Sequence, residues 1–378
     1  MPRKGYDEVV LLTGFPSFRA RRMCEEIVLS EGPRALVHAI VHPKLQADAL
    51  AALDALPLDA RRRVHLIEGD AAAMDLGLSG AEFRELSREV DRIHHCVQVS
   101  YLGADRATAE HVNVGAAREV IEVARVCPHL RCLVVHSSAW VSGDRSGVVR
   151  ENELDCGQRF RNPIEETLAQ AERIYRRAMA RTKDPLPIAV LRPTMVVGDS
   201  ATGEVDRLDG PYLLILLMLT APPDLALPVP GRADVPLNVV PIDFVARAAI
   251  AIGRDARAPG KTFHLVDPTP LPARRLVELV ARAGGRRAPS GFLPANIARA
   301  ILRAPGIERI AKSPRAFLEA MTVPVVYDHT NADELLQNTG IACPPLESYI
   351  DRLVTHVQRW LEARAERRES ELPPDPLA

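Results

Sequence analysis

The sequence predicts an α/β fold built on a doubly wound parallel sheet. Short apolar runs rich in Val, Ile and Leu alternate with segments of helical periodicity along the first 200 residues. Runs of this kind are typical of strands buried on both faces, and buried strands that alternate with helices form parallel sheets. The first run ends in Thr13-Gly14 and leads directly into a helical pattern, as a strand, a turn and a helix would.

The strands are expected at residues 8–14, 36–41, 64–70, 93–99, 132–136 and 188–191. The first helix is expected at 18–31 and the last at 346–364, where apolar residues recur at helical spacing. Residues 286–321 have the pattern of basic amphipathic helices, which would either cap an apolar ligand or pack on the core. We therefore expect a Rossmann-like core at 1–200, a region at 201–364 that completes the core and forms a smaller substrate or cap lobe, and a mobile tail at 365–378.

Composition excludes several classes of function. The 378 residues include 48 basic and 49 acidic side chains, so no overall charge favours nucleic acid or an anionic membrane. The first residues lack a secretory hydrophobic region and the apolar run 213–219 is too short for a membrane span, which predicts a cytoplasmic protein. The six cysteines show no C-x-x-C spacing, and the neighbouring His94, His95 and Cys96 would point to alternate faces of a strand, so no metal site is expected.

A set of motifs gives a more specific indication. Asn162, Thr167, Ala171 and Glu172 keep the frame Asn-x-Tyr-x-x-Ser/Thr-Lys-x-x-Ala-Glu. Together with further motifs in the expected order, this frame resembles the extended short-chain dehydrogenase/reductase (SDR) family, in particular its thioester reductase and fatty acyl-CoA reductase branch. These further motifs include Leu76-Gly77-Leu78-Ser79, Ser137-Ser138, Leu191-Arg192-Pro193 and Gly198-Asp199-Ser200-Ala201-Thr202-Gly203. The resemblance implies a Rossmann-like fold and reduction of carrier-bound or coenzyme A thioesters with NADPH.

Two residues depart from that frame, since Ile164 stands at the tyrosine position and Leu168 at the lysine position. The family's tyrosine exchanges a proton with the substrate oxygen, and its lysine lowers the pKa of the phenol and binds the nicotinamide ribose. A hydrocarbon can neither ionise nor donate a hydrogen bond. Spacing alone also fits the buried face of an ordinary amphipathic helix. With the frame in place, we expect the pair to leave an apolar wall in a cleft.

The expected cofactor loop is also altered. Thr13, Gly14, Ser17 and Ala20 occupy the family's Thr-Gly-x-x-Gly-x-x-Gly, so only the first glycine is kept. Ser17 adds a side chain where backbone and phosphate would meet, and Pro16 removes a backbone donor. Three arginines follow the turn and would either bind phosphate in another way or form a solvated helix face: Arg19, Arg21 and Arg22.

Other cofactor and catalytic positions are partly kept. Val97 and Gln98 replace small residues beside the cofactor, and His42 stands where an NADPH-binding member often has arginine. Three residues match the family: Asp70 at the adenine, Asn113 near the catalytic region and Ser138 at the catalytic serine. Each of the three also has a local hydrogen-bonding role that needs no ligand.

These departures predict a pseudoenzyme: an SDR-fold protein without hydride transfer, with no or weak NAD(P) binding, acting as a sensor, regulator or scaffold. Its partner would be an unknown protein or an apolar small-molecule ligand, and a homodimer is possible in this family. The alternative is an NAD(P)-dependent reductase of an acyl thioester or carbonyl substrate with a relocated proton donor. Glu165 and Tyr175 are poor replacements, because Glu165 points about 100° away from position 164 and Tyr175 lies about three turns further along the helix.

Overall fold

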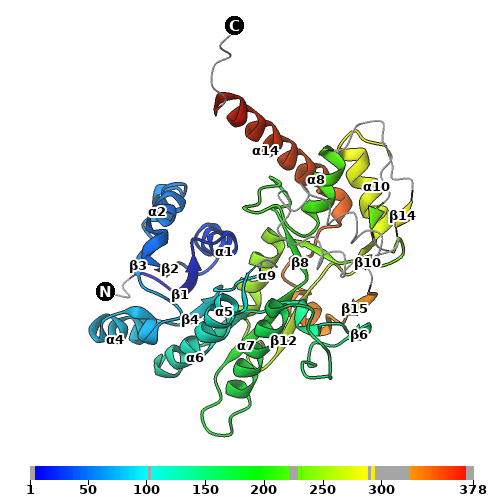
Figure 1. Ribbon diagram of the computed structural model, residues 1–378. Coiled ribbons are helices and arrows are strands. Elements are labelled where there is room, and N and C mark those ends of the chain that lie inside the picture. The colour runs from blue at the N-terminus through cyan, green and yellow to red at the C-terminus, as the bar shows by residue number, and fades with distance from the viewer. Residues whose placement is uncertain are drawn as a thin grey trace. The chain divides into compact units, whose positions relative to one another are not determined.

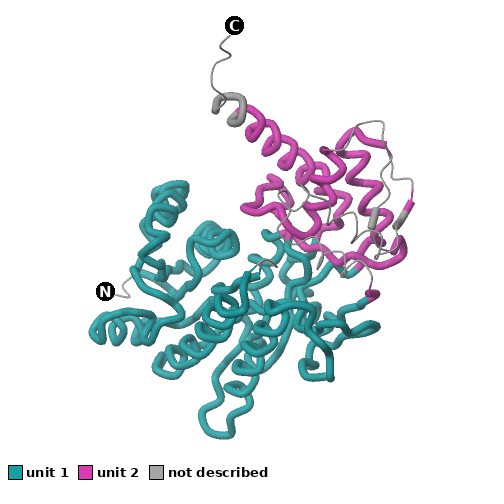
Figure 2. Tube along the Cα trace, in the orientation of Figure 1, with its two compact units in different colours: residues 1–196, 242–268, 325–343 teal, residues 197–241, 269–324, 344–378 magenta. Residues whose placement is uncertain are grey.

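The computed structural model describes residues 5–100, 104–220, 229–230, 232–287, 291–293 and 323–371. The chain divides into two compact units, shown in different colours in Figure 2. Unit 1 comprises Met1–Val196, Ile242–Pro268 and Val325–Cys343, and unit 2 comprises Val197–Pro241, Thr269–Pro324 and Pro344–Ala378. The chain therefore returns twice to unit 1 after leaving it.

A seven-stranded sheet forms the centre of unit 1, and all its strands are parallel. Its strands are β1 (Glu8–Phe15), β2 (Ala35–Val41), β3 (Val64–Glu68), β4 (Arg92–His95), β5 (Cys132–His136), β7 (Ile188–Pro193) and β12 (Thr262–Leu265). Their order is β12-β7-β5-β4-β1-β2-β3, so the chain builds outward from β1 in one direction and then, from β4, in the other. The predicted α/β, doubly wound parallel fold is confirmed.

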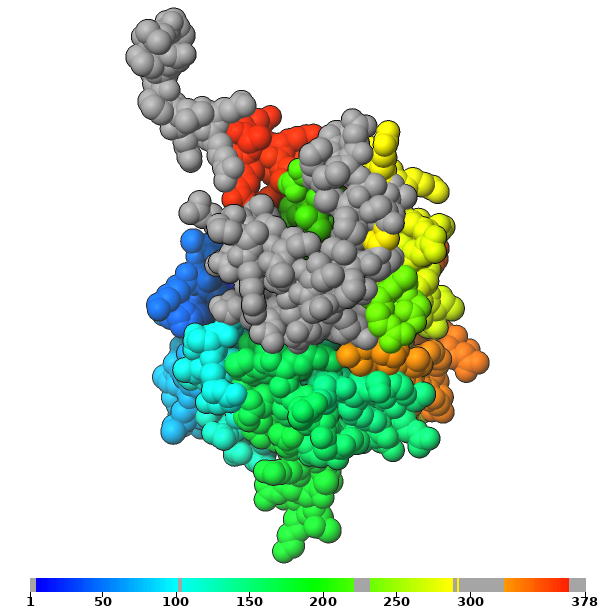
Figure 3. Space-filling view, turned by 45° about the vertical axis from the view of Figure 1, so that its right-hand side comes forward, coloured from blue at the N-terminus to red at the C-terminus, as the bar shows by residue number. Residues whose placement is uncertain are grey.

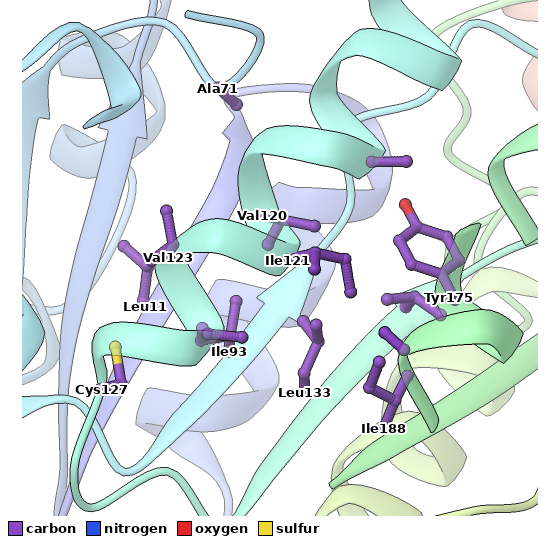
Figure 4. Close-up of a cluster of buried hydrophobic side chains, with 14 of the residues drawn as sticks. Leu11, Ala71, Ile93, Val120, Ile121, Val123, Cys127, Leu133, Tyr175 and Ile188 are labelled. Carbon is purple, nitrogen blue, oxygen red and sulfur yellow. The ribbon is translucent and has the colours of Figure 1, made fainter. Parts of the chain in front are cut away.

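Helices cover both faces of this sheet (Figure 1). One face is covered by α1 (Phe18–Leu29) and α9 (Ile242–Arg254). The other carries α4 (Gly80–Glu89), α6 (Ala116–Val126) and α7 (Pro163–Met179). Side chains of α6 and α7 meet those of the strands in the apolar core drawn in Figure 4, and Leu86 of α4 belongs to the same cluster. The segment between α7 and β7 projects from unit 1 (Figures 1 and 3). Shorter elements of unit 1 are α2 (Gln46–Asp54), α3 (Leu58–Arg61), α5 (Arg106–Ala109), β6 (Gly147–Val149), β15 (Val325–Tyr327) and α13 (Thr330–Leu336).

Local sequence signals explain where the two helices nearest the expected site begin. The side chain of Ser17 accepts a hydrogen bond from the backbone N–H of Ala20 and caps α1. Asn162 caps α7 in the same way, accepting from the N–H of Glu165 at 3.0 Å, and Pro163 follows at the first helical position. Side-chain acceptors at the cap and proline at the first turn satisfy or remove donors that a helix start leaves unpaired.

Strand β4 ends at His95, four residues before the predicted end at Val99. Beyond it, the side chain of Asn113 takes the place of a neighbouring strand: Oδ1 accepts from the N–H of Val99 at 2.8 Å and Nδ2 donates to its carbonyl at 3.1 Å. The chain therefore leaves the sheet after His95, and at Val99 the side chain of Asn113 supplies the backbone hydrogen bonds that a neighbouring strand would otherwise make.

Three helices of unit 2 pack against one another: α8 (Tyr212–Thr220), α10 (Ala273–Ala283) and α14 (Ile350–Glu371). Its short strands include β10 (Pro236–Leu237), β11 (Val239–Pro241) and β13 (Leu271–Pro272). Further short strands are β8 (Met195–Val197), β9 (Val229–Pro230) and β14 (Phe292–Leu293). Helix α14 continues seven residues past 364 into the expected tail, and residues 372–378 lie outside the described residues. Most of the basic segment 286–321 also lies outside them.

Candidate functional site

The carboxyl ends of β1 and β4 meet where the strand order of unit 1 reverses. Gly14, near the end of β1, has φ of +88°, and a Cβ there would lie 2.9 Å from the backbone of both Cys96 and Val97. No other residue type fits this contact without displacing backbone. In open α/β sheets the crevice at such a reversal point is where ligands bind. Gly14 and Val97 are thus brought together as the sequence predicts.

The loop after Gly14 leads into α1. Thr13 is fully buried and its hydroxyl hydrogen-bonds to Nδ1 of His95 at 2.9 Å, which ties β1 to β4. Ser17 is exposed and its Oγ caps α1, while Ala20 is fully buried against the sheet. Ala20 therefore allows close packing of the helix on the strand, and Ser17 stands at the N-cap just before the helix.

Two further cofactor candidates stand at the neighbouring strand ends, and both make local hydrogen bonds. His42 follows β2, and its Nδ1 accepts from the N–H of Lys44 at 3.2 Å. Asp70 follows β3, and its Oδ1 accepts from the N–H of Ala72 at 2.9 Å. Both side chains are partly exposed, so each can still accept a further hydrogen bond from a group outside the chain.

Asn113 connects the segment that follows β4 to α7, the helix that carries the expected catalytic frame. Besides its two bonds to Val99, its Nδ2 donates to Oγ1 of Thr167 on α7 at 3.0 Å. Asn113 lies in the π-helical turn Glu110–Gly115 and is buried. These contacts give Asn113 a positioning role between Val99 and α7.

The serine pair at the end of β5 divides into an inward and an outward residue. Ser137 is buried and donates to Oε2 of Glu172 at 2.8 Å. Ser138 is partly exposed, and its Oγ accepts from the N–H of Trp140 at 3.2 Å. The proton of the Ser138 hydroxyl remains available to a group outside the chain.

The aliphatic pair on α7 is enclosed rather than lining a cleft. Ile164 is 0% exposed and Leu168 is 4% exposed. Both belong to an apolar cluster with Ala104, Ala109, Val141, Leu154 and Ala169. The expectation of an apolar wall in a cleft is wrong, because neighbouring apolar side chains fill the space in front of both residues. Their burial matches the ordinary buried face of an amphipathic helix.

Neither Glu165 nor Tyr175 can take the place of a phenol at position 164. Glu165 is buried and is held by Arg161, whose N–H and Nη1 lie 2.9 and 3.2 Å from its carboxylate oxygens. Tyr175 lies in the apolar core between α6, α7 and the sheet, as Figure 4 shows. Burial raises the pKa of the Tyr175 phenol above its usual value. The Tyr175 ring packs edge-on against His95 with ring centroids 6.3 Å apart and is 4% exposed, so its phenol lies in the core and not in an open crevice.

A contact that sequence reasoning did not predict lies beside Gly14. Nη1 of Arg19, in the first turn of α1, hydrogen-bonds to Oε1 of Gln98 at 2.5 Å. His136, at the end of β5, is close enough for the charge of Arg19 to contribute to lowering its pKa, after burial itself. The cluster of three arginines was the available signal, but nothing in their spacing distinguishes Arg19 from the other two.

The comparisons with known proteins agree with this geometry. Residues 12–249, well over half of the chain, match the NAD-binding family described as male sterility protein. The chain belongs to this family. Isonitrile lipopeptide synthase of Streptomyces coeruleorubidus is 25% identical over 396 residues, covering 93% of this chain and 25% of that protein. The fatty acyl-CoA reductase wat of Drosophila melanogaster is 21% identical, covering 66% of this chain and 54% of that protein.

Glycine betaine reductase ATRR of Emericella nidulans is 27% identical over 57% of this chain, which spans only 17% of that protein. The chain therefore spans about half or less of the length of these curated relatives. Among solved structures, the terminal R domain from the myxalamid PKS-NRPS biosynthetic pathway has a TM-score of 0.76 at 24% identity, covering 94% of this chain and 91% of that chain. A UDP-glucuronic acid 4-epimerase from Bacillus cereus in complex with NAD has a TM-score of 0.67 at 17% identity, covering 93% and 99%.

Membership of this extended SDR, thioester-reductase-like family corrects one expectation. The family is NAD-binding, which contradicts the expectation from the altered loop that the protein has no NAD(P) cofactor. Gly14 still allows the close approach of β1 to Cys96 and Val97, although the later glycines of the loop are not kept.

Membrane spans and metal clusters are both absent from the described residues. No helix among them combines the length and apolarity needed to cross a membrane. The same part of the chain holds no group of three or more His, Cys, Asp or Glu side chains suited to a metal ion.

Proposed function

We propose that the protein is an NAD(P)-dependent reductase of an acyl thioester or carbonyl substrate, with a proton source other than a tyrosine on α7. The observation that carries this proposal is the contact of Gly14 with the backbone of Cys96 and Val97 at the strand-order reversal. A Cβ at Gly14 would clash with the backbone of Cys96 and Val97, so the glycine allows the two strand ends to approach closely at the reversal point, where ligands bind in open α/β sheets. Membership of an NAD-binding family supports the same cofactor class.

The proposed reduction needs no residue of the protein to gain or lose electrons. When bound, NAD(P)H supplies a hydride to the carbonyl carbon. The carbonyl oxygen takes up a proton, and with a thioester the carbon–sulfur bond then breaks to release a thiol and an aldehyde. Ser138 is the partly exposed hydroxyl at the carboxyl end of β5, so we assign it the hydrogen bond to the carbonyl oxygen. Ile164 and Leu168 cannot provide the proton, so we assign the proton to water.

A second candidate function is supported by the closed cluster around Ile164 and Leu168. A protein that binds NAD(P) and holds no proton donor at this helix could report the cofactor's presence to a partner without turning it over. Such a regulator would share the cofactor site with the reductase. The two candidates therefore differ in hydride transfer and not in binding.

The deciding experiment follows the hydride. The full chain is incubated with NADPH deuterated at C4 and with acyl-coenzyme A of several chain lengths, and mass spectrometry measures deuterium in the aldehyde or alcohol product. Deuterium in the product, reduced at least about tenfold in rate by Ser138→Ala, supports the reductase. Calorimetric binding of NADPH without any deuterium transfer supports the regulator. Absence of binding for both NADPH and NADH would sink both candidates.

A further inference from the structure

Arg19 is a cation that faces a neutral partner at the edge of the sheet. Its side chain turns inward from the first turn of α1 and bonds the amide of Gln98. Within the described part of the chain, no ion pair involves Arg19. Its two neighbours differ, since Arg22 pairs with Glu25 at 2.8 Å and Arg21 donates to the carbonyl oxygen of Pro16 at 3.3 Å. The side chain is partly buried, and burial lowers the pKa of Arg19 below its usual value.

Two residues beyond or at the ends of the adjacent strands β4 and β5 carry nitrogens without a hydrogen-bond partner among the residues that the structure describes. Both ring nitrogens of His136 are unpaired, although the residue is only 4% exposed. Nε2 of Gln98 is also buried and unpaired, while the Oε1 of the same amide faces Arg19. A neutral imidazole and an amide each have an N–H that can donate. Three groups able to donate thus come from the start of α1 and from the carboxyl ends of the adjacent strands β4 and β5.

Burying these groups costs folding free energy unless an anion pairs with the charge and accepts the hydrogen bonds. A guanidinium removed from water without a negative partner loses solvation that a neutral amide does not restore. Buried N–H groups without an acceptor add to this cost. Position adds a further argument, because α1 is twelve residues long and the positive end of its dipole lies at the same place.

We propose that Arg19, Gln98 and His136 form a binding site for the diphosphate group of a dinucleotide. This inference rests on the proposed function, because it names the group through which the cofactor is held. Arg19 supplies charge where Pro16 has no N–H and where Ser17 replaces the second loop glycine. The altered loop and the NAD-binding family are then compatible, since a side chain replaces backbone donors that the loop has lost.

The test compares Arg19→Leu with Arg22→Leu in the full chain. Both arginines lie on the first turns of α1, but Arg22 is already paired with Glu25, which makes it a matched control. Calorimetry measures binding of NADPH, of ADP and of adenosine, the last of which lacks the diphosphate. We expect Arg19→Leu to weaken NADPH and ADP by about 10- to 100-fold and to leave adenosine unchanged, with Arg22→Leu close to wild type.

Salt gives a second readout. Raising sodium chloride from about 50 to about 300 mM should weaken ADP binding to the wild-type chain more than binding to Arg19→Leu, because the variant lacks the charge that salt screens. Arg19→Lys should retain part of the affinity, since it keeps the charge and loses the planar fork.

The outcomes separate this inference from the proposed function. Unchanged or tighter NADPH binding in Arg19→Leu would overturn the diphosphate site and leave the reductase intact. Equal losses for adenosine and ADP would also overturn it, because the effect would not depend on the diphosphate. Arg19-dependent binding of ADP together with no deuterium transfer would support the site while removing the reductase.

Discussion

Glu172 on α7 and Arg192 on β7 form a two-pronged ion pair in the interior of unit 1. Nη2 and Nε of Arg192 lie 2.6 and 2.9 Å from the two carboxylate oxygens, and the side chains are 0% and 1% exposed. Ser137 and Arg176 add hydrogen bonds to the same carboxylate. The pair fixes α7 to the strand next to β5, which ends in the serine pair, so it positions one side of the candidate site.

Glu172→Gln should therefore destabilise the protein strongly. Removing one member of a buried pair leaves the guanidinium of Arg192 uncompensated, and we expect a loss of about 3–5 kcal/mol in the free energy of unfolding. Urea unfolding measures it. The control is Glu166→Gln on the same helix, whose pair with Arg106 is partly exposed and should cost about 0–1 kcal/mol. Equal losses in the two variants would contradict the structural role of the buried pair.

The pH dependence of this pair has a defined sign. Burial opposes ionisation of Glu172, but Arg192 and the hydrogen bonds hold its pKa below the usual value. A carboxyl with a depressed native pKa contributes stability that is present above its unfolded pKa, about 4.3, and is lost as the pH falls through the native value. Glu172→Gln should flatten the acid limb of the stability curve below about pH 4.3.

Gly14→Ala should cost more stability than replacement of a glycine with similar φ in open space. Gly157, at φ +78°, has nothing within 4 Å of an added Cβ, so Gly157→Ala measures the backbone strain alone, about 1–2 kcal/mol. Gly14→Ala adds a clash with Cys96 and Val97 and should cost at least about 2 kcal/mol more. Chemical denaturation compares the two variants. Similar losses would show that the strand ends are free to separate.

Buried histidines should make the protein lose stability in mild acid. Burial lowers the pKa of His94 and of His95 to about 3. Since an unfolded histidine titrates near about 6.5, the neutral rings stabilise the native state fully above that pH, and the stability is lost as the pH falls toward 3. Each should add a slope of about 1.4 kcal/mol per pH unit.

The variant His94→Leu isolates one of these slopes. We expect the change of unfolding free energy between about pH 6.5 and about pH 5 to be smaller in His94→Leu than in the wild-type chain. His129→Gln, at an exposed position, should leave the slope unchanged. A slope that stays the same in His94→Leu would mean that this ring is protonated in the native state.

The sequence predicted the parallel sheet well because its strands are continuous apolar runs, and β5 has the predicted ends. It did not predict β12, a four-residue strand in which Thr262 and His264 are polar but buried. Their groups are satisfied by partners far along the chain: the side chain of Asn331 donates to the Thr262 carbonyl, and His264 contacts Arg192. Periodicity cannot reveal a buried polar residue whose partners come from distant segments.

Sequence patterns are limited in the same way at the candidate site, because they do not reveal contacts between distant residues. Gly14, Asn113 and Ser138 stand at places where the motif order puts them, since strand ends and helix starts fix their positions. The contact between Arg19 and Gln98 joins residues 79 positions apart through long side chains, which no local pattern encodes. The enclosure of Ile164 could not be distinguished from exposure to a cleft, because both give the same helical spacing.

Restoring a tyrosine and a lysine on α7 should destabilise the protein without raising its reductase rate. In Ile164→Tyr/Leu168→Lys, a larger ring enters a filled cluster and an ammonium enters a position that is 4% exposed. The combined loss should be about 3 kcal/mol or more, against about 0.5–1.5 kcal/mol for the control Ile164→Val. Urea unfolding and single-turnover deuteride transfer measure the two effects. A folded double variant that reduces acyl-coenzyme A faster than the wild-type chain would show that position 164 can open to substrate, and that its present side chain limits the chemistry.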